Sequence, residues 1–195
     1  MLFRSDAIAA LKEAPVTFPV ALKLASPDIP HKTEADAVRL NVKTLDELKA
    51  AAQTVVTNGK KHTPNARIDG VSVQEMASGV EMILGAVNDP HFGPYVMVGL
   101  GGVLTEVLHD VSHRFAPITP DDARDMLAEL KGAKILEGYR GAPPADVDAI
   151  VDALVRLSYV IHDHQDRIAE IDVNPVFARG KGKGAVAADA LIVLR

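Results

Sequence analysis

The sequence lacks cysteine and tryptophan, and only 4% of its 195 residues are aromatic. Without cysteine, disulfide bonds and thiolate chemistry are excluded. So few aromatic side chains make stacking a poor candidate for the main binding mode. A formal net charge of −5 argues against a large nucleic-acid footprint, which would need a basic surface. We therefore expect no nucleic acid among the partners.

Long apolar runs are missing as well. No stretch approaches the roughly 20 apolar residues of a membrane-spanning helix. The first ten residues hold an arginine and lack the apolar centre of a signal peptide. We expect no membrane partner and a cytoplasmic location. The composition, 48% hydrophobic and 24% charged, is that of a globular protein with ample area for a core.

Local patterns predict both helices and strands. Helices are expected at about 5–14, 44–57, 120–130 and 144–164, and strands at 18–25, 38–42, 71–76, 79–87, 95–100, 168–178 and 185–194. Residues 103–108 fit a helix or a strand. The strands at 71–76 and 79–87 are read as neighbours joined by a short turn, and the last two strands as a hairpin. This order predicts an α+β (α/β) fold with mixed or antiparallel sheets flanked by helices.

Two basic residues near the first long strand are candidates for phosphate chemistry. Lys23 interrupts the apolar run FPVALKLA, where a charge is costly unless it reaches water or a partner. It fits a solvated strand face or a phosphate-binding cleft. His31 follows in the loop SPDIPHKTEADAV, and a neutral imidazole nitrogen can accept a phosphoryl group. It equally fits an ordinary surface histidine.

The terminal hairpin carries acids and an amide at alternating positions. Glu170, Asp172 and Asn174 share one face of the expected strand, and Asp189 lies on the returning strand. The hairpin is able to bring Asn174 and Asp189 together. Carboxylate and amide oxygens suit Mg²⁺, which keeps waters and bridges to substrate phosphates. A merely polar, solvent-facing hairpin has the same pattern.

Other candidate positions are less specific. Backbone groups of Gln74–Met76 are able to meet an adenine edge, with Glu81 near ribose hydroxyls. Gly99–Gly102 fits either a close approach to phosphate or a tight turn. His162 and His164 fit a metal site or a helix end that balances the helix dipole.

Four stretches taken together resemble a known family. They are VALKLASPDIPHKTEADAVRLNV, VSVQEMASGVEMILGAVNDPHFGPYVMVGLGGVLTEVLHDVSHRFAPI, GYRGAPPADVDAIVDALVRLS and AEIDVNPVFA. Their sequence is similar to the ATP-grasp domain of NDP-forming acyl-CoA synthetases, relatives of the succinyl-CoA synthetase β-subunit. The resemblance covers the chain from about Phe18 to its end. It implies one ATP-grasp domain over 1–195, with the nucleotide-binding loop and central strands in 18–110 and the C-terminal helices and Mg-binding hairpin in 119–195.

The resemblance also implies an activity and roles for residues. Members of the family interconvert acyl-CoA, phosphate and ADP with acid, CoA and ATP through phosphohistidine. By matching position, His31 is the expected phosphoryl carrier and Lys23 the phosphate-binding lysine. The remaining implied contacts are Gln74, Glu75 and Met76 at the adenine, Glu81 at the ribose, and Asn174 and Asp189 as Mg²⁺ ligands. Arg114 lies in a shared stretch, but the resemblance gives it no role.

Two departures from the family pattern shape the expectations. Asp36 and Ala37 stand where the family has a glycine pair or a glycine with a small residue, and a carboxylate there is expected to repel a triphosphate. Only about 17 residues precede the strand with Lys23, so part of the family's N-terminal segment is expected to be lacking.

The resemblance implies that CoA is reached only through partners. These are CoA-binding and ligase domains or an α-type subunit, in a homo- or hetero-oligomer. The function implied is the nucleotide-binding component of an NDP-forming acyl-CoA synthetase. The alternative is a non-catalytic ATP-grasp-like regulatory domain, as in fusions with protein acetyltransferases.

Overall fold

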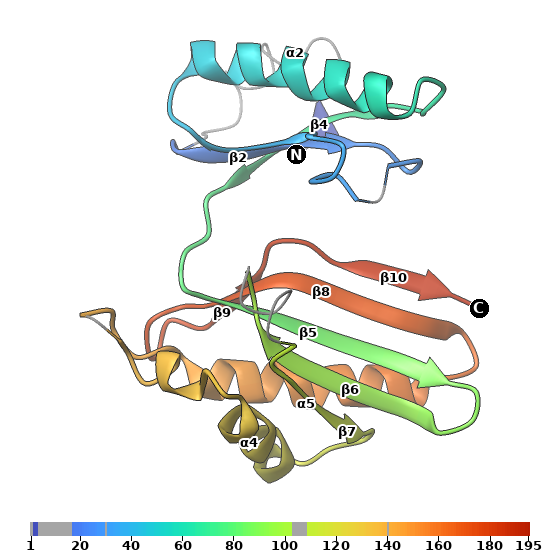
Figure 1. Cartoon of the computed structure of the whole chain (residues 1–195), viewed down its shortest axis with the longest axis vertical. Coiled ribbons are helices and arrows are strands. Elements are labelled where there is room, and N and C mark those ends of the chain that lie inside the picture. Colours follow the sequence, from blue (N-terminus) through green and yellow to red (C-terminus); the bar gives the residue numbers. More distant parts are fainter. Residues whose placement is uncertain (1, 4–16, 30, 103–108, 140) are drawn as a thin grey trace. The chain divides into compact units, whose positions relative to one another are not determined.

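Figure 1 shows the computed structural model of the chain, which describes residues 2–3, 17–29, 31–102, 109–139 and 141–195. The chain forms two compact units, Met1–Met76 and Ala77–Arg195. This division falls after Met76, whereas the domain prediction separates 18–110 from 119–195 within one domain. That domain prediction stays a prediction. The helix expected at 5–14 and the ambiguous segment 103–108 lie largely or wholly outside the described residues.

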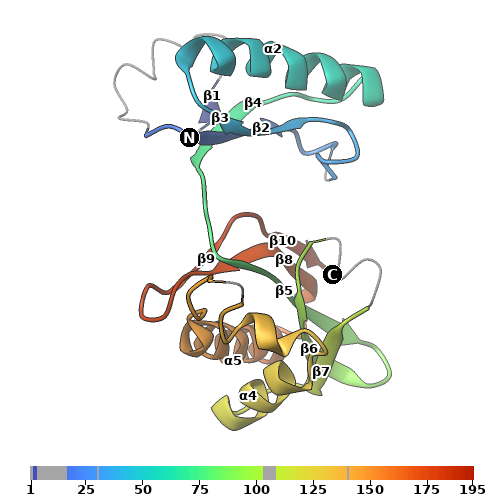
Figure 2. The ribbon, with the colours of Figure 1, turned by 60° about the vertical axis from the view of Figure 1, so that its left-hand side comes forward.

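The first unit is an antiparallel sheet covered on one face by a helix. Its strands lie in the order β1 (Leu2–Phe3), β4 (Gly70–Glu75), β2 (Val20–Ala25) and β3 (Val38–Val42). Helix α2 (Leu45–His62) runs along the sheet, as both ribbon views show (Figures 1 and 2). The predicted strand at 38–42 is confirmed, and the one at 18–25 begins two residues later, at Val20.

Helix α2 has clear sequence reasons for its two ends. The Thr44 side chain accepts a hydrogen bond from the Glu47 amide at 3.2 Å, as the capping signature predicts. The Glu47 carboxylate reaches back one residue further than in a regular capping box, to the Lys43 amide at 2.7 Å. The helix continues past its predicted end at Thr57 because Lys60 and neighbouring basic residues favour the negative end of the helix dipole.

The core of the first unit lies between α2 and the sheet. Leu22 and Leu24 of β2 pack with Leu48 and Val55 of α2, all almost fully buried. Each such burial stabilises the unit by about 1.5–3 kcal/mol. Gly59 permits a close approach, because a Cβ atom there would lie 2.3 Å from Leu24 Cδ2. The helix-facing side of β2 is therefore fixed by packing.

The second unit is a six-stranded antiparallel sheet with helices on one face. The order is β10 (Leu191–Leu194), β8 (Ile168–Ala178), β5 (Val80–Asp89), β6 (Gly93–Leu100) and β7 (Val111–Phe115), and β9 (Ala185–Ala187) also pairs with β8. The helices are α4 (Pro120–Glu129), the 3₁₀ turn η1 (Ala133–Ile135) and α5 (Val147–Asp163). The predicted α+β fold with antiparallel sheets and flanking helices is confirmed.

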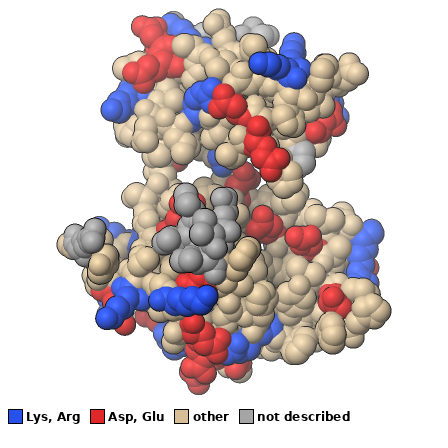
Figure 3. Space-filling model, viewed as in Figure 1, with Lys and Arg blue, Asp and Glu red and all other residues tan. Residues whose placement is uncertain are grey.

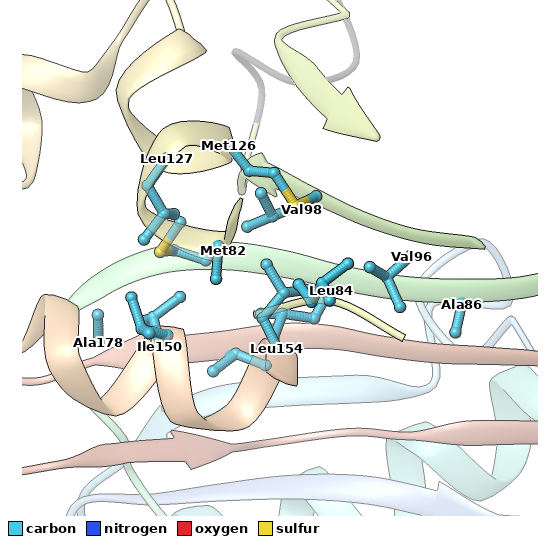
Figure 4. Close-up of a cluster of buried hydrophobic side chains, with 14 of the residues drawn as sticks. Met82, Leu84, Ala86, Val96, Val98, Met126, Leu127, Ile150, Leu154 and Ala178 are labelled. Atoms are coloured by element: carbon cyan, nitrogen blue, oxygen red, sulfur yellow. The ribbon is translucent and has the colours of Figure 1, made fainter. Parts of the chain in front are cut away.

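The core of the second unit joins both helices to the sheet. Figure 4 shows side chains of β5 and β6 meeting those of α4 and α5. Met82, Met126, Ile150 and Leu154 are completely buried there. Ser158 of α5 is buried too, and its hydroxyl accepts from the Ile118 amide at 3.1 Å. These contacts bury one face of the sheet against the helices. The opposite face of the sheet lies outside this core.

One predicted strand pairing is wrong. The strands at 71–76 and 79–87 were expected to be neighbours, but β4 belongs to the first sheet and β5 to the second. The residues between them, Ala77–Gly79, link the two units instead of forming a hairpin turn. At Gly79 the chain passes so close to β8 that a Cβ atom would lie 2.2 Å from the Ala178 carbonyl oxygen. The start of β5 therefore pairs with β8 and not with β4.

The described helices and surface agree with the composition. None of the helices in the described part of the chain is long and apolar enough to cross a lipid bilayer. On the face drawn in Figure 3, Lys and Arg side chains lie beside Asp and Glu side chains on each unit. Charges of both signs are thus mixed, as 21 basic and 26 acidic residues suggest.

Candidate functional site

Lys23 and Gln74 share the face of the first sheet that lies opposite α2. Lys23 pairs with Ser72 of β4 and Val38 of β3, and Gln74 pairs with Ala21. Since Leu22 and Leu24 turn to the helix, the alternating Lys23 turns away from it. Lys23 is partly buried, as is typical of a lysine whose aliphatic chain packs against the protein while its ammonium group stays in a polar environment. An ammonium group held at a sheet face is suited to phosphate.

The predicted adenine-binding residues stand at the end of β4. Gln74 and Glu75 are exposed, and Met76 is the last residue of the first unit. Glu75 pairs with Val20, whose side chain belongs to the core beside α2, so the side chains of Gln74 and Glu75 point to opposite faces. Gln74 is therefore the member of this group whose side chain shares a face with Lys23.

His31 begins a compact loop after β2. Its imidazole is exposed, while Ala35 and Ala37 further along the loop are buried. The Leu24 amide donates to the Ala37 carbonyl oxygen at 3.0 Å, which ties the end of the loop to the middle of the sheet. The loop therefore exposes His31 to solvent, while the end of the loop is hydrogen bonded to the sheet.

The surroundings of Asp36 differ from those expected from the sequence. Its backbone takes a left-handed φ of 47°, the conformation that a glycine would favour. Its carboxylate receives two hydrogen bonds from the Arg39 guanidinium, at 2.7 and 2.9 Å, and one from Asn58 of α2 at 2.8 Å. The hydrogen bonds from Arg39 hold the pKa of Asp36 below its usual value. The negative charge is therefore balanced by a neighbouring cation.

In the second unit, Glu81 is packed against the glycine-rich segment. The Gly101 amide donates to the Glu81 carbonyl oxygen at 2.7 Å. A Cβ atom on Gly101 would lie 2.5 Å from Glu81 Cγ, so only glycine fits there. Gly102 follows with a φ of 75°. The described part of the glycine segment is thus the end of β6 and the two residues after it, packed against Glu81, whose side chain remains exposed.

The hairpin places Asn174 and Asp189 directly opposite one another. The Asn174 amide donates to the Asp189 carbonyl oxygen at 3.2 Å, and the Ala188 amide donates to Pro175 at 2.9 Å. Ile171 and Val173 turn to the core, so the alternating Asp172 lies on the face away from the helices, and the register of β8 against β5 shifts between Val173 and Val176, where Asn174 lies. The backbone therefore brings Asn174 and Asp189 together at one end of the hairpin, and the Asp189 carboxylate accepts from the Ala190 amide at 3.1 Å.

Asp172 is a further residue of this face. It pairs with Leu191 of β10 on one side and with Gly85 of β5 on the other. Asp172 alternates with Asn174 in the sequence, but the family resemblance gives Asp172 no role. We add Asp172 to the candidate oxygen ligands of the hairpin.

The hairpin fits a magnesium ion that brings other ligands with it. No group of three or more His, Cys, Asp or Glu side chains in the described part of the chain is arranged to hold a metal by itself. Mg²⁺ is normally bound through one or two carboxylates, waters and substrate phosphates. The amide of Asn174 with the carboxylates of Asp189 and Asp172 supplies that kind of donor set.

Arg114 has a structural setting. Its guanidinium forms an ion pair with Glu129 of α4, and the Ser112 hydroxyl donates to the same carboxylate at 2.6 Å. These hydrogen bonds, that of Arg114 first, hold the pKa of Glu129 below its usual value. Arg114 therefore fastens β7 to α4.

The two histidines stand at the end of α5. His162 lies in the last turn, and the His164 carbonyl oxygen accepts from the amides of Arg167 and Ile168, each at 2.9 Å. They belong to none of the possible metal groups among the described residues. A basic side chain at a helix C-terminus also agrees with the helix dipole.

Comparisons with known proteins show the family of the chain. A family profile described as ATP-grasp domain matches residues 2–194. The chain is 47% identical to the acetate–CoA ligase [ADP-forming] II subunit beta of Pyrococcus furiosus, over 95% of this chain and 80% of that subunit. It is 41% identical to the 4-hydroxybutyrate–CoA ligase [ADP-forming] of Nitrosopumilus maritimus, over 97% of this chain but only 27% of that enzyme.

A solved structure extends the agreement to the fold. The dinucleotide-forming acetyl-coenzyme A synthetase 1 of Ca. Korarchaeum cryptofilum, in complex with coenzyme A and Ca-AMPCP, matches with a TM-score of 0.90 and 43% identity. The match covers 100% of this chain and 84% of that one. The chain therefore belongs to the ATP-grasp family, in the group that contains the beta subunits of ADP-forming acetate–CoA ligases.

Proposed function

We propose that this chain is the nucleotide-binding component of an NDP-forming acyl-CoA synthetase. It binds ATP or ADP with Mg²⁺ and passes a phosphoryl group between the nucleotide and a histidine. The observation that carries the proposal is the hairpin of the second unit, where the Asn174 amide is hydrogen bonded to the Asp189 carbonyl oxygen. Membership of the ATP-grasp family supports the choice of nucleotide as the ligand.

Each unit carries groups suited to a part of this ligand. In the first unit, the Lys23 ammonium neutralises phosphate charge, and the end of β4 at Gln74–Met76 meets the adenine. In the second unit, Glu81 accepts from ribose hydroxyls, and the hairpin holds Mg²⁺. Mg²⁺, when bound, offsets the negative charge of the phosphates. Catalysis in phosphoryl transfer is mostly positioning and charge neutralisation, which these side chains provide.

His31 is the proposed phosphoryl carrier. A neutral imidazole nitrogen attacks the γ-phosphorus of ATP, an N–P bond forms, and the bond from phosphorus to the ADP oxygen breaks. The proton of the ring passes to solvent. The exposed imidazole at the start of the loop supports this role, because a buried ring would be unable to exchange the group with a partner.

The acyl-CoA half of the reaction is assigned to partners. The relatives include separate beta subunits, of which the chain spans 80%, and long single-chain ligases, of which it spans about a quarter. We propose that CoA-binding and ligase domains, or an α-type subunit, complete the enzyme. The regulatory alternative is not favoured, since the relatives described above are named as ligases or synthetases. The cytoplasmic location stays a prediction.

Calorimetric titration with ATP, in Mg²⁺ and again in EDTA, tests the nucleotide part. We expect Mg²⁺-dependent binding, and Lys23→Met should weaken it about tenfold, as loss of a charge-assisted phosphate contact predicts. Lys49→Met is the matched control, because Lys49 lies on α2 and pairs with Asp46. Absence of binding by the intact chain, or equal effects of both substitutions, would contradict the proposal.

Labelling with γ-³²P-ATP tests the carrier. We expect an acid-labile label that His31→Gln removes while ATP binding persists. His91→Gln is the control, because His91 is also an exposed loop histidine, in the β5–β6 turn. A label that survives His31→Gln would assign the carrier elsewhere.

A further inference from the structure

The loop of residues 31–37 is one turn of helix closed by a Schellman motif. The Ala37 amide donates to the Lys32 carbonyl oxygen at 2.9 Å, and the Asp36 amide donates to Thr33 at 3.0 Å. These are the two bonds that define the motif, and they place Asp36 at its left-handed position. Glycine usually occupies that position because it lacks a Cβ atom.

Asp36 occupies this position with compensating contacts to two other elements. Both terminal nitrogens of Arg39, a residue of β3, donate hydrogen bonds to the Asp36 carboxylate. Asn58 of α2 donates to its carboxylate at 2.8 Å and to its carbonyl oxygen at 2.9 Å. One residue therefore joins the loop to both the sheet and the helix of the first unit.

These contacts lie on the helix side of the sheet. Arg39 pairs with Leu22, whose side chain faces α2, whereas Lys23 faces the opposite side. Asn58 is itself a residue of α2, next to the Gly59 that lets the helix approach β2. The carboxylate of Asp36 is thus directed away from the face that carries Lys23.

We propose that Asp36, Arg39 and Asn58 form a clasp that holds the loop of His31 in its folded turn before nucleotide binds. Asp36 is then a positioning residue and not a source of repulsion. The part of this inference that concerns nucleotide rests on the proposed function, whereas the clasp itself does not. A preformed loop spares the ligand the cost of ordering it.

Hydrogen exchange tests the clasp without any ligand. Asp36→Gly removes the carboxylate but also relaxes the left-handed backbone, whereas Asn58→Ala removes the helix partner while keeping a good helix former. Either change should speed exchange of the Ala37 amide about tenfold, as expected for the loss of charge-assisted hydrogen bonds. Asp46→Asn is the control, because Asp46 belongs to an exposed ion pair of α2. Unchanged exchange at Ala37 would overturn the clasp whatever the nucleotide result.

Nucleotide affinity then tests whether the clasp contributes to ATP binding. Asp36→Gly should weaken ATP binding several-fold, and adding Arg39→Gln to it should change little more, because both remove the same contact. Asp36→Asn should restore part of the affinity, since its amide oxygen still accepts a hydrogen bond. ATP binding that is equal or tighter in Asp36→Gly would overturn the positioning role in favour of repulsion. Failure of the intact chain to bind ATP would instead contradict the proposed function, with the exchange result still deciding the clasp.

Discussion

The two units share a plan but hold their candidate residues by different means. In each unit a sheet buries one face under helices and carries the candidate side chains on the other face or at its edge. The loop of His31 is held by side-chain contacts of Asp36, Arg39 and Asn58 in addition to its backbone hydrogen bonds. The ends of the hairpin at Asn174 and Asp189 are fixed by backbone hydrogen bonds. The loop should therefore depend on a few side chains, whereas the hairpin should keep its shape when its side chains are replaced.

The largest expected effect comes from the two cores. Leu154→Ala in α5 and Leu24→Ala in β2 each remove a completely buried side chain and should each lower the free energy of unfolding by about 2–5 kcal/mol. Because the two cores are separate clusters, each change should speed amide exchange in its own unit. Hydrogen exchange measured strand by strand checks this. Equal acceleration in both units would show that they unfold together.

The next effect should appear at the hairpin. Asn174→Ala should weaken ATP binding in Mg²⁺ by about tenfold or more, since even outer partners of metal ligands contribute 10–100-fold. Binding in EDTA should stay unchanged, because the backbone pairing of the hairpin needs no side chain. Calorimetry in both conditions measures the difference.

Asn65→Ala supplies the control for the hairpin variant, since Asn65 is an exposed loop asparagine of the first unit. An equal loss of affinity with and without Mg²⁺ would mean that Asn174 supports folding or binds nucleotide directly. A fall in thermal stability would mean that the hairpin, like the loop, depends on its side chains.

The smallest effect should come from Arg114, whose pairing with Glu129 is partly exposed. Arg114→Gln should lower Tm slightly and leave ATP binding unchanged. The pKa of Glu129 is lowered from 4.5 in the folded protein, so its stabilisation is present above that value and is lost as pH falls through the folded pKa. Thermal melts should therefore show the wild type and the variant converging in acid. A constant difference down to low pH would assign the effect to something other than this ion pair.

The sequence predicted most elements because local signals and periodicity were strong. The helices expected at 44–57 and 120–130 and the strand expected at 38–42 all correspond to elements found in the structure. The terminal hairpin was predicted too, but the returning strand expected at 185–194 is divided into β9 and β10, and Asp189 lies between them while its backbone pairs with Asn174. These features depend on residues close together in the sequence.

What the sequence could not show depends on distant contacts. The break between β4 and β5 follows from the pairing of β5 with β8, about 90 residues further along. The setting of Asp36 depends on Asn58, 22 residues away on α2, so a carboxylate that reads as repulsive in the sequence is paired in the structure. Charge and strand patterns identify such residues, but only the fold gives their partners.

Amide chemical-shift mapping by NMR, with ATP added in Mg²⁺ and then in EDTA, tests the central claim most directly. We predict Mg²⁺-dependent shifts at two sets of residues, Lys23 and the loop of His31 in the first unit, and the hairpin at Asn174 and Asp189 in the second. The Arg114–Glu129 region should stay unchanged. Shifts confined to other residues, or none at saturating ATP, would contradict the assignment of these residues to nucleotide binding.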